Sequence, residues 1–135
     1  MFLLDTMVLS EAGKRRSNAA VVQWMDDHDA DGLYVSTITF GEIFDGIERK
    51  RKLDPVFATR LDRWAADTRY EYRERTFPVT TEIALRWGAL SAALGRRDLD
   101  LFIAATALEH DLTVVTRNVR HFEPTGAKLF NPYEA

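Results

Sequence analysis

Apolar and polar positions along this chain form two kinds of pattern, which alternate with one another. Short apolar runs bounded by polar residues are typical of strands that are buried on both faces. Between these runs, longer segments repeat their apolar positions every three or four residues, which is the period of an amphipathic helix. The runs that predict strands are Leu3-Leu4, Leu33-Tyr34-Val35, Phe77-Pro78-Val79, Thr113-Val114-Val115 and Lys128-Leu129-Phe130.

The helical segments lie between these runs. Asn18 is suited to cap one helix, and Pro55 is suited to the first turn of another, where its missing N–H costs nothing. Helices are predicted from Asp5-Thr6 to before Gly13, after Asn18 through His28, from Thr39 to Arg51 with a stripe of Phe40, Ile43, Phe44 and Ile47, after Pro55, from Glu82 to Leu94, and from Leu101 to Leu108. Strands that alternate with helices predict an α/β fold, in which helices cover both faces of a parallel sheet.

Four polar residues stand where the predicted elements meet. Asp5 follows the first strand, Asn118 trails the fourth, Glu42 lies near the start of a helix, and Asp100 opens another. Because ligands of open α/β sheets bind beyond the carboxyl ends of parallel strands, we expect these residues to converge in one cleft. Three carboxylates and an amide favour a hard divalent cation, Mg²⁺ or Mn²⁺. Such an ion would offset their repulsion and activate water for attack on a phosphate ester.

Each of these residues also has a structural explanation, because each lies near a predicted helix start. Asp5 and Asn118 are suited to capping, and Asp98 competes with Asp100 for the cap of the buried helix. Glu42 stands three residues after Thr39, which is the spacing of a capping box. Capping explains any one residue well, but it does not explain why carboxylates recur at the same kind of junction.

Composition limits the class of protein. The chain has 135 residues, of which 46% are hydrophobic, and we expect a single domain over residues 1–135. It has no cysteine, which fits a reducing compartment such as the cytoplasm. No apolar run approaches membrane-spanning length, so no association with a membrane is expected.

A net charge of −3 argues against binding nucleic acid over the whole surface, but the basic residues are clustered. The patches are Lys14-Arg15-Arg16, Arg49-Lys50-Arg51-Lys52, Arg96-Arg97, and Arg117 with Arg120. Solvated helix ends and loops explain each patch by itself. Placed around the acidic cleft, several patches together would hold a phosphate backbone.

Other active-site chemistries lack their motifs. The three histidines have no metal-ligand spacing, the serines lack a nucleophile-elbow context, and no phosphate-binding glycine loop is present. Two further functions stay open. Asp5 after a strand is a candidate nucleophile for phosphoryl transfer, although Met7 stands where a second acid would be needed. Alternatively, the acidic cleft binds a basic peptide without catalysis.

Four segments carry a resemblance to a known family. They are Leu3 to Glu11 (LLDTMVLSE), Ser36 to Ile43 (STITFGEI), Asp100 to Ala107 (DLFIAATA) and Val115 to Phe122 (VTRNVRHF). In order, spacing and flanking residues they resemble the PIN-domain ribonucleases, specifically the VapC/FitB-type toxins of bacterial toxin–antitoxin pairs. The resemblance extends from Met1 to about Tyr133.

This resemblance implies an α/β/α sandwich and an endoribonuclease that depends on Mg²⁺ or Mn²⁺. Asp5, Glu42 and Asp100 match the acidic positions that hold the ion, and Asn118 matches a fourth position that is Asp in some members. Thr6 and Thr116 match supporting hydroxyl positions, whereas Met7 departs from the Asn of many relatives.

The resemblance also implies partners. They are an RNA substrate, a small cognate antitoxin whose tail occupies the cleft, and a second copy of the chain in a homodimer. Arg15, Arg49, Lys50 and Arg117 are the candidate contacts to RNA. The segment 95–99 is shorter than the usual approach to Asp100, so the rim of the cleft is expected to differ from that of relatives.

Overall fold

The structure is a computed structural model and describes residues 1–134. Its centre is a five-stranded parallel sheet in the order β3-β2-β1-β4-β5. The strands are β1 (Phe2–Leu4), β2 (Leu33–Ser36), β3 (Thr76–Phe77), β4 (Thr113–Val115) and β5 (Lys128–Phe130). The predicted parallel sheet is therefore confirmed.

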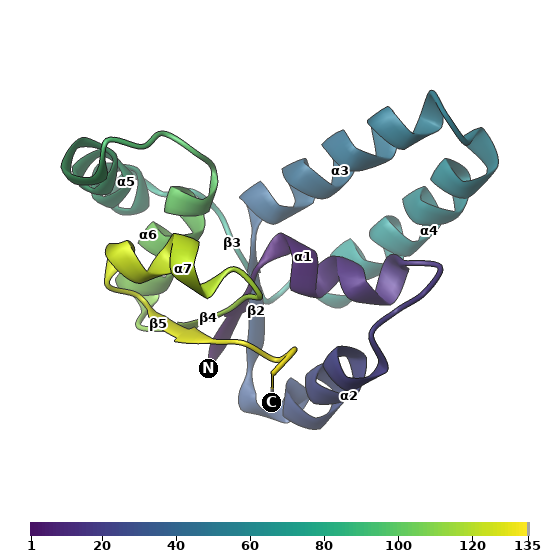
Figure 1. Ribbon diagram of the computed structural model, residues 1–135, viewed down its shortest axis with the longest axis horizontal. Coiled ribbons are helices and arrows are strands. Elements are labelled where there is room, and N and C mark those ends of the chain that lie inside the picture. The colour runs from purple at the N-terminus through teal and green to yellow at the C-terminus, as the bar shows by residue number, and fades with distance from the viewer. Residues whose placement is uncertain (135) are drawn as a thin grey trace.

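Seven α-helices flank the sheet within the described residues. They are α1 (Thr6–Leu9), α2 (Ala19–His28), α3 (Thr37–Arg51), α4 (Pro55–Glu71), α5 (Thr81–Leu94), α6 (Asp100–His110) and α7 (Val119–Phe122). Short 3₁₀ turns at Ser10–Gly13, Asp29–Asp31 and Glu123–Thr125 complete the connections. In Figure 1, α5, α6 and α7 lie on one side of the sheet, whereas α1 to α4 lie on the other.

The two sides have separate hydrophobic cores because neighbouring side chains of a strand point to opposite faces. In β1, Leu4 belongs to the core that includes Ile43 of α3, whereas Leu3 belongs to the core that includes Ile103 of α6. The residues of β4 divide between the two cores in the same way. This arrangement is the three-layer α/β/α sandwich that the resemblance implied.

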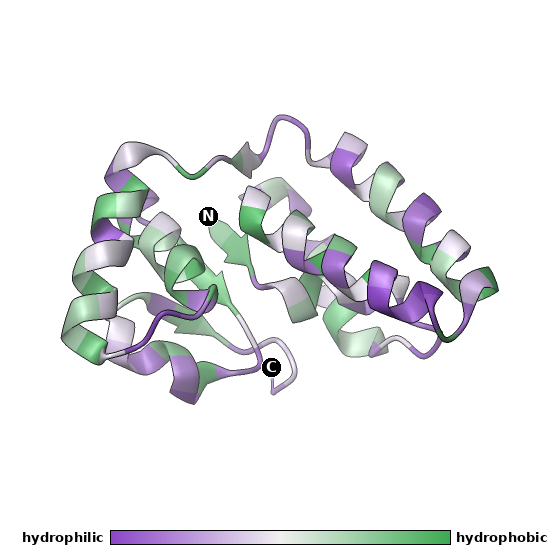
Figure 2. Ribbon diagram, turned by 90° about the horizontal axis from the view of Figure 1, so that it is seen from above, coloured by the Kyte–Doolittle hydropathy of each residue, from purple (hydrophilic) through white to green (hydrophobic). Residues whose placement is uncertain are grey.

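The long helices α3 and α4 form a hairpin that extends away from the sheet (Figure 1). Figure 2 shows hydrophilic residues recurring along both of these helices, while the strand beside the N-terminus is hydrophobic. Gly13 lies against Trp64 in the middle of α4, so closely that a Cβ at position 13 would come within 2.8 Å of the Trp64 ring. No helix among the described residues combines the length and the apolar character needed to cross a bilayer.

The start of α3 differs from the prediction. Ser36 caps the helix by accepting a hydrogen bond from the Ile38 N–H at 3.1 Å, so the helix begins at Thr37 and not near Thr39. Thr39 is buried inside the first turns of the helix, and the expected Thr39–Glu42 capping box is wrong. The apolar stripe also needs correction, because Phe44 is 52% exposed whereas Ile43 and Ile47 are buried.

Other boundaries agree more closely. Asn18 caps α2 and Pro55 opens α4, as expected, and Gly95 ends α5 in a left-handed conformation. The strand predicted at residues 77–79 instead spans Thr76–Phe77, and it ends before Pro78 because proline lacks the N–H that a ladder requires. Neither Asp98 nor Asp100 caps α6, because that helix has no side-chain cap.

Candidate active site

Asp5 lies at the carboxyl end of the central strand β1. Its side chain is 5% exposed, and it accepts hydrogen bonds from the Thr6 N–H and the Thr116 hydroxyl, each at 2.8 Å. Asp5 therefore caps α1 and also faces the crevice between β1 and β4. Capping and a role in the site, which the sequence left as alternatives, are compatible at this residue. Such burial, with both oxygens engaged, disfavours Asp5 as a nucleophile for phosphoryl transfer.

Glu42 reaches the same region from α3. Its Oε1 accepts a hydrogen bond from the Thr6 hydroxyl at 2.7 Å, and that hydroxyl also lies 3.4 Å from the hydroxyl of Thr39. Thr6 thus contacts Asp5 through its backbone and Glu42 through its side chain. This small residue holds two carboxylates from distant segments in a fixed relation.

Asp100 comes from the opposite helical layer, as the first residue of α6. It is half-buried, and its Oδ2 lies 3.3 Å from Nε2 of His121. The negative charge of Asp100 contributes to raising the pKa of both Asp5 and Glu42, so the three carboxylates act on one another electrostatically. The fold therefore brings Asp5, Glu42 and Asp100 into one electrostatic neighbourhood.

The pKa values of these three carboxyl groups are all raised, so each carboxylate is less stable in its charged form than in water. Burial is the largest cause and raises the pKa of Asp5 to about 6, against the hydrogen bond from Thr116 that lowers it. Burial likewise raises the pKa of Glu42 and of Asp100. Buried carboxylates that repel one another favour a cation among them, and their oxygen atoms suit a hard divalent ion. The residues present therefore fit a divalent metal.

Beside Asp100 lies a second charged group that motif analysis did not identify. Arg96 donates to both oxygens of Asp98 at 2.8 and 2.9 Å and to the carbonyl of His121 at 2.7 Å. The hydrogen bonds from Arg96 are the main reason that the pKa of Asp98 is lowered to about 2. Arg96 and His121 thereby connect the segment before α6 to α7. The signals for this group in the sequence are only the basic pair at 96–97 and a histidine near Asn118.

Among the described residues, Asp98, Asp100 and His121 are the one set of three potential ligands whose atoms all lie within 4.8 Å of one another. This acidic cluster is able to bind a metal. However, the guanidinium of Arg96 already neutralises Asp98 and would repel a cation placed there. Asp5, Glu42 and Asp100 are not such a set, so an ion held by all three would need their carboxyl groups to move closer together than in this structure. Asp100 belongs to both groups of acids, and the side facing Asp5 and Glu42 is free of the repulsion from Arg96.

Asn118 is placed differently. Its backbone N–H donates to the Thr116 hydroxyl at 2.9 Å, but its side chain is exposed and makes no cap on α7. It lines a shallow hollow with Met7 and Arg117, whose guanidinium lies over the Tyr133 ring. Within the described residues, the Asn118 amide forms no hydrogen bond to the three carboxylates.

The other candidate RNA contacts are engaged within the chain. Arg15 pairs with Asp54 and lies over the Phe57 ring, and the Lys50 ammonium lies 5.7 Å from the centre of the same ring. Arg49 pairs with Asp45 at 3.1 Å on the surface of α3. Exposed pairs of this kind contribute little stability, so these cations can exchange partners with a phosphate.

Two hollows meet at Glu42. One, of about 240 Å³, is largely apolar and extends from Thr6 toward Phe57 and Trp64 of the α4 helix. The other lies between α3 and Leu99, in the segment before α6. Glu42 therefore borders two open hollows, whose described linings include neither Asp5 nor Asp100.

Comparison with known proteins agrees with this architecture. Residues 2–127 match the family model of the PIN domain. The plasmid stability protein StbB of Pseudomonas syringae pv. tomato is 34% identical over 100% of both chains, and VapC ribonuclease Y4jK of Sinorhizobium fredii is 31% identical over 99% of each. The crystal structure of FitAcB from Neisseria gonorrhoeae matches with a TM-score of 0.86 at 30% identity, over 100% of both chains. The chain therefore belongs to the PIN domain family, among relatives of the VapC and FitB proteins.

Proposed function

We propose that this protein is a metal-dependent endoribonuclease and the toxin of a toxin–antitoxin pair. The observation that supports the proposal is that Asp5, Glu42 and Asp100, from three elements, act on one another electrostatically and have raised pKa values. The relatives support the chemistry, because one is named a VapC ribonuclease and another a plasmid stability protein.

Asp5, Glu42 and Asp100 would hold Mg²⁺ or Mn²⁺, with Asn118 assisting after rotation of its exposed side chain. The chemistry that such an ion supplies is stabilisation of charge on the phosphate and generation of hydroxide at neutral pH. Thr116 and Thr6 orient Asp5 and Glu42 by donating their hydroxyl protons to single carboxylate oxygens. Arg96 and His121 keep Asp100 at the head of α6.

The RNA backbone would lie along the hollows beside Glu42. Arg49 and Lys50 are exposed on α3, and exposed Arg15 lies over Phe57 of α4. Arg117 is exposed beside Asn118. The cationic groups of these residues would bind phosphates and keep the chain in register for cleavage. We place this activity in the cytoplasm, where RNA is available.

A small antitoxin is the proposed inhibitor, with its tail in the same hollows, and a second copy of the chain is the proposed dimer partner. Support for protein contacts comes from large apolar side chains on the surface of the monomer. Phe44 on α3 is 52% exposed and Leu85 on α5 is 70% exposed. Such side chains are common at subunit interfaces.

The decisive experiment measures cleavage of structured RNAs by the purified protein. Cleavage is expected in Mg²⁺ or Mn²⁺, to stop in chelator, and to return when metal is restored. Asp5→Asn should abolish it, whereas Asp27→Asn, the same change at an exposed position of α2, should leave it intact. Cleavage that survives chelator and Asp5→Asn would refute the mechanism. A folded protein with no nuclease activity in any metal would favour a binding module.

A further inference from the structure

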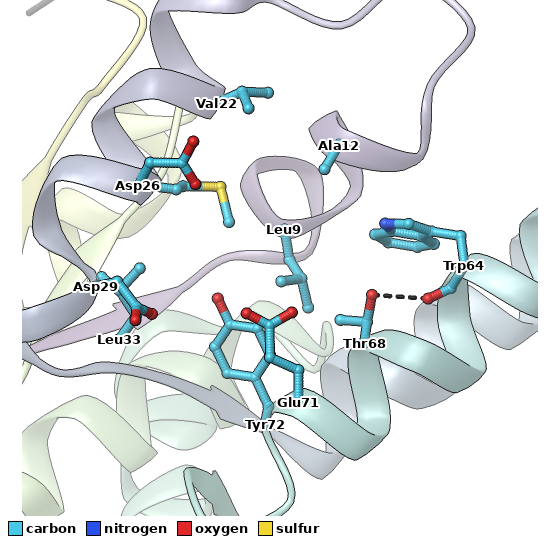
Figure 3. A pocket seen from close by; sticks show the side chains of 11 residues that line it. Leu9, Ala12, Val22, Asp26, Asp29, Leu33, Trp64, Thr68, Glu71 and Tyr72 are labelled. Atoms are coloured by element: carbon cyan, nitrogen blue, oxygen red, sulfur yellow. Dashed lines mark hydrogen bonds between the residues drawn. The ribbon is translucent and has the colours of Figure 1, made fainter.

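A cavity of about 290 Å³ lies between α2, α4 and the Ser10–Gly13 turn (Figure 3). Its wall includes Leu33, the first residue of β2, whereas Asp5 follows the last residue of β1. Because these two strands run parallel, Leu33 lies at the amino ends of the strands and Asp5 lies at their carboxyl ends. The described lining contains neither Glu42 nor Asp100. The cavity therefore contains none of the three candidate metal ligands, and it shares only Trp64 of its described lining with the apolar hollow beside Glu42.

The lining is divided into an acidic side and an apolar side. Asp26, Asp29 and Glu71 gather on one side of the cavity in Figure 3, and Trp64 stands on the other. Leu9 closes the cavity between them. A ligand that matches both sides has a charged end and an apolar stem.

The acidic side carries more negative charge than its neighbours balance. Arg75 pairs with Asp29 at 2.9 Å and lies 4.0 Å from Glu71. Asp26 forms no ion pair within residues 1–134. Three carboxylates therefore share one guanidinium, which leaves an excess of negative charge at the cavity.

Tyr72 provides an independent sign of a ligand. The residue is 4% exposed, and its hydroxyl points into the cavity with no hydrogen bond to any described residue (Figure 3). The ring itself is fixed by Arg75, whose guanidinium lies 4.3 Å from the ring centre. Burial raises the pKa of Tyr72 to about 12, so the hydroxyl keeps its proton and an acceptor lone pair. Because this hydroxyl faces the cavity and has no partner among the described residues, a ligand or water in the cavity supplies its hydrogen bond.

We propose that this cavity binds a guanidinium or primary ammonium group on an apolar stem, presented as an arginine or lysine side chain by a partner protein. The cation lies among Asp26, Asp29 and Glu71 and donates to the Tyr72 hydroxyl. The methylene stem packs on Leu9 and Trp64, as such stems do on apolar surfaces. This assignment does not depend on the catalytic proposal.

The distribution of charge favours a side chain over a free polyamine. The carboxylates lie together on one side, so the cavity offers a place for one cationic group. The opposite wall, at Trp64, is apolar and offers no second anion for the next amine of a polyamine chain.

Nuclear magnetic resonance titration of the ¹⁵N-labelled full chain tests the proposal. The probe is Nα-acetyl-arginine N-methylamide, and the citrulline derivative is its uncharged control of the same shape. The arginine derivative is expected to shift the Trp64 indole and Tyr72 amide signals, and added salt should weaken its binding. Asp26→Asn and Tyr72→Phe should each weaken binding by about twofold to fivefold. The neighbouring Asp27→Asn should not.

Several outcomes would overturn the proposal. They are equal shifts with the citrulline derivative, no shifts with the arginine derivative, or equal weakening by Asp26→Asn and Asp27→Asn. Tighter binding of spermidine than of the arginine derivative would contradict the assignment to a side chain. RNA cleavage by Asp26→Asn should equal that of the unmodified protein, so the result is separable from the test of catalysis.

Discussion

A single residue, Asp5, combines two tasks that sequence analysis treats as alternatives. It caps a one-turn helix and faces a crevice in the sheet, because β1 ends where α1 begins. The cost of this position is the burial of a carboxylate beside others, which raises its pKa to about 6. At the residue scale, the site is therefore built at the expense of the stability of the metal-free protein.

The pH dependence of stability follows from that pKa. The folded state binds the Asp5 proton more tightly than the unfolded state, whose pKa is near 3.8. This contribution to stability is fully present below about pH 4 and is lost as the pH rises through about 6. In chelator, Asp5→Asn should raise the free energy of unfolding at neutral pH by about 1–3 kcal/mol. The gain should vanish near pH 4, as measured by urea unfolding.

Asp27→Asn is the control for this measurement, since Asp27 is an exposed carboxylate. It should show no comparable change with pH. A metal-free Asp5→Asn protein that is less stable than the unmodified chain at neutral pH would contradict the argument.

Sequence reasoning located the acidic residues because strand ends and helix starts leave a visible pattern. It did not identify Arg96 and His121, whose importance depends on a contact between segments 25 residues apart. It also did not place the Asn118 side chain, because a backbone hydrogen bond to Thr116 satisfies that turn without the amide. Contacts between loops leave no periodic signal.

Among the elements, α3 shows how the residue that caps a helix determines the position of a functional side chain, here that of Glu42. Ser36, Thr37 and Thr39 are all able to cap a helix, and the sequence does not distinguish among them. The buried Ser36 hydroxyl makes the cap, which places Glu42 beside Thr6 and not at the helix start. Helix existence was predictable here, whereas the first residue was not.

Ser36→Ala is expected to lower the free energy of unfolding by about 1 kcal/mol, because the Ile38 N–H loses its acceptor. Thr37→Ala, at the adjacent exposed position, should change stability little. Urea unfolding of the two variants measures the difference. Equal destabilisation would mean that the cap does not fix the start of α3.

A second prediction at this scale concerns Arg96, in the connection between α5 and α6. Arg96→Gln removes the charge that holds Asp98 and the His121 carbonyl, so Asp100 loses part of its support. Residues that support metal ligands typically affect metal affinity or activity by about 10- to 100-fold. We expect a loss of RNA cleavage in that range with a smaller change in unfolding midpoint.

Arg97→Gln is the matched control, because Arg97 is exposed and lies over the Trp87 ring. Arg96→Lys should restore only part of the activity, since lysine cannot make the bidentate contact. Full activity of Arg96→Gln would show that Asp100 needs no such support.

The whole molecule places the site at the centre of the sheet. The chain leaves β1 toward β2 on one side and later returns to β4 on the other, which creates the crevice where Asp5 and Thr116 meet. Alternation of strand and helix patterns predicted the α/β class. Strand order was not predictable, because the short strands carry similar apolar residues on both faces.

Metal binding at the centre of the sheet should change the melting temperature of the whole molecule. Mg²⁺ should raise the melting temperature of the unmodified protein, since a ligand at about 100 times its dissociation constant adds about 2.7 kcal/mol to stability. The Asp5→Asn protein should respond much less. Identical shifts in the two proteins would place metal binding elsewhere.

The division of the molecule into two cores has a mechanical consequence. Glu42 is carried by the layer containing α3, and Asp100 by the layer containing α6. An ion bound by both residues would link the two helical layers directly, in addition to their packing on opposite faces of the sheet. When metal is added, amide hydrogen exchange should then slow in helices on both faces of the sheet, including residues far from the metal ligands.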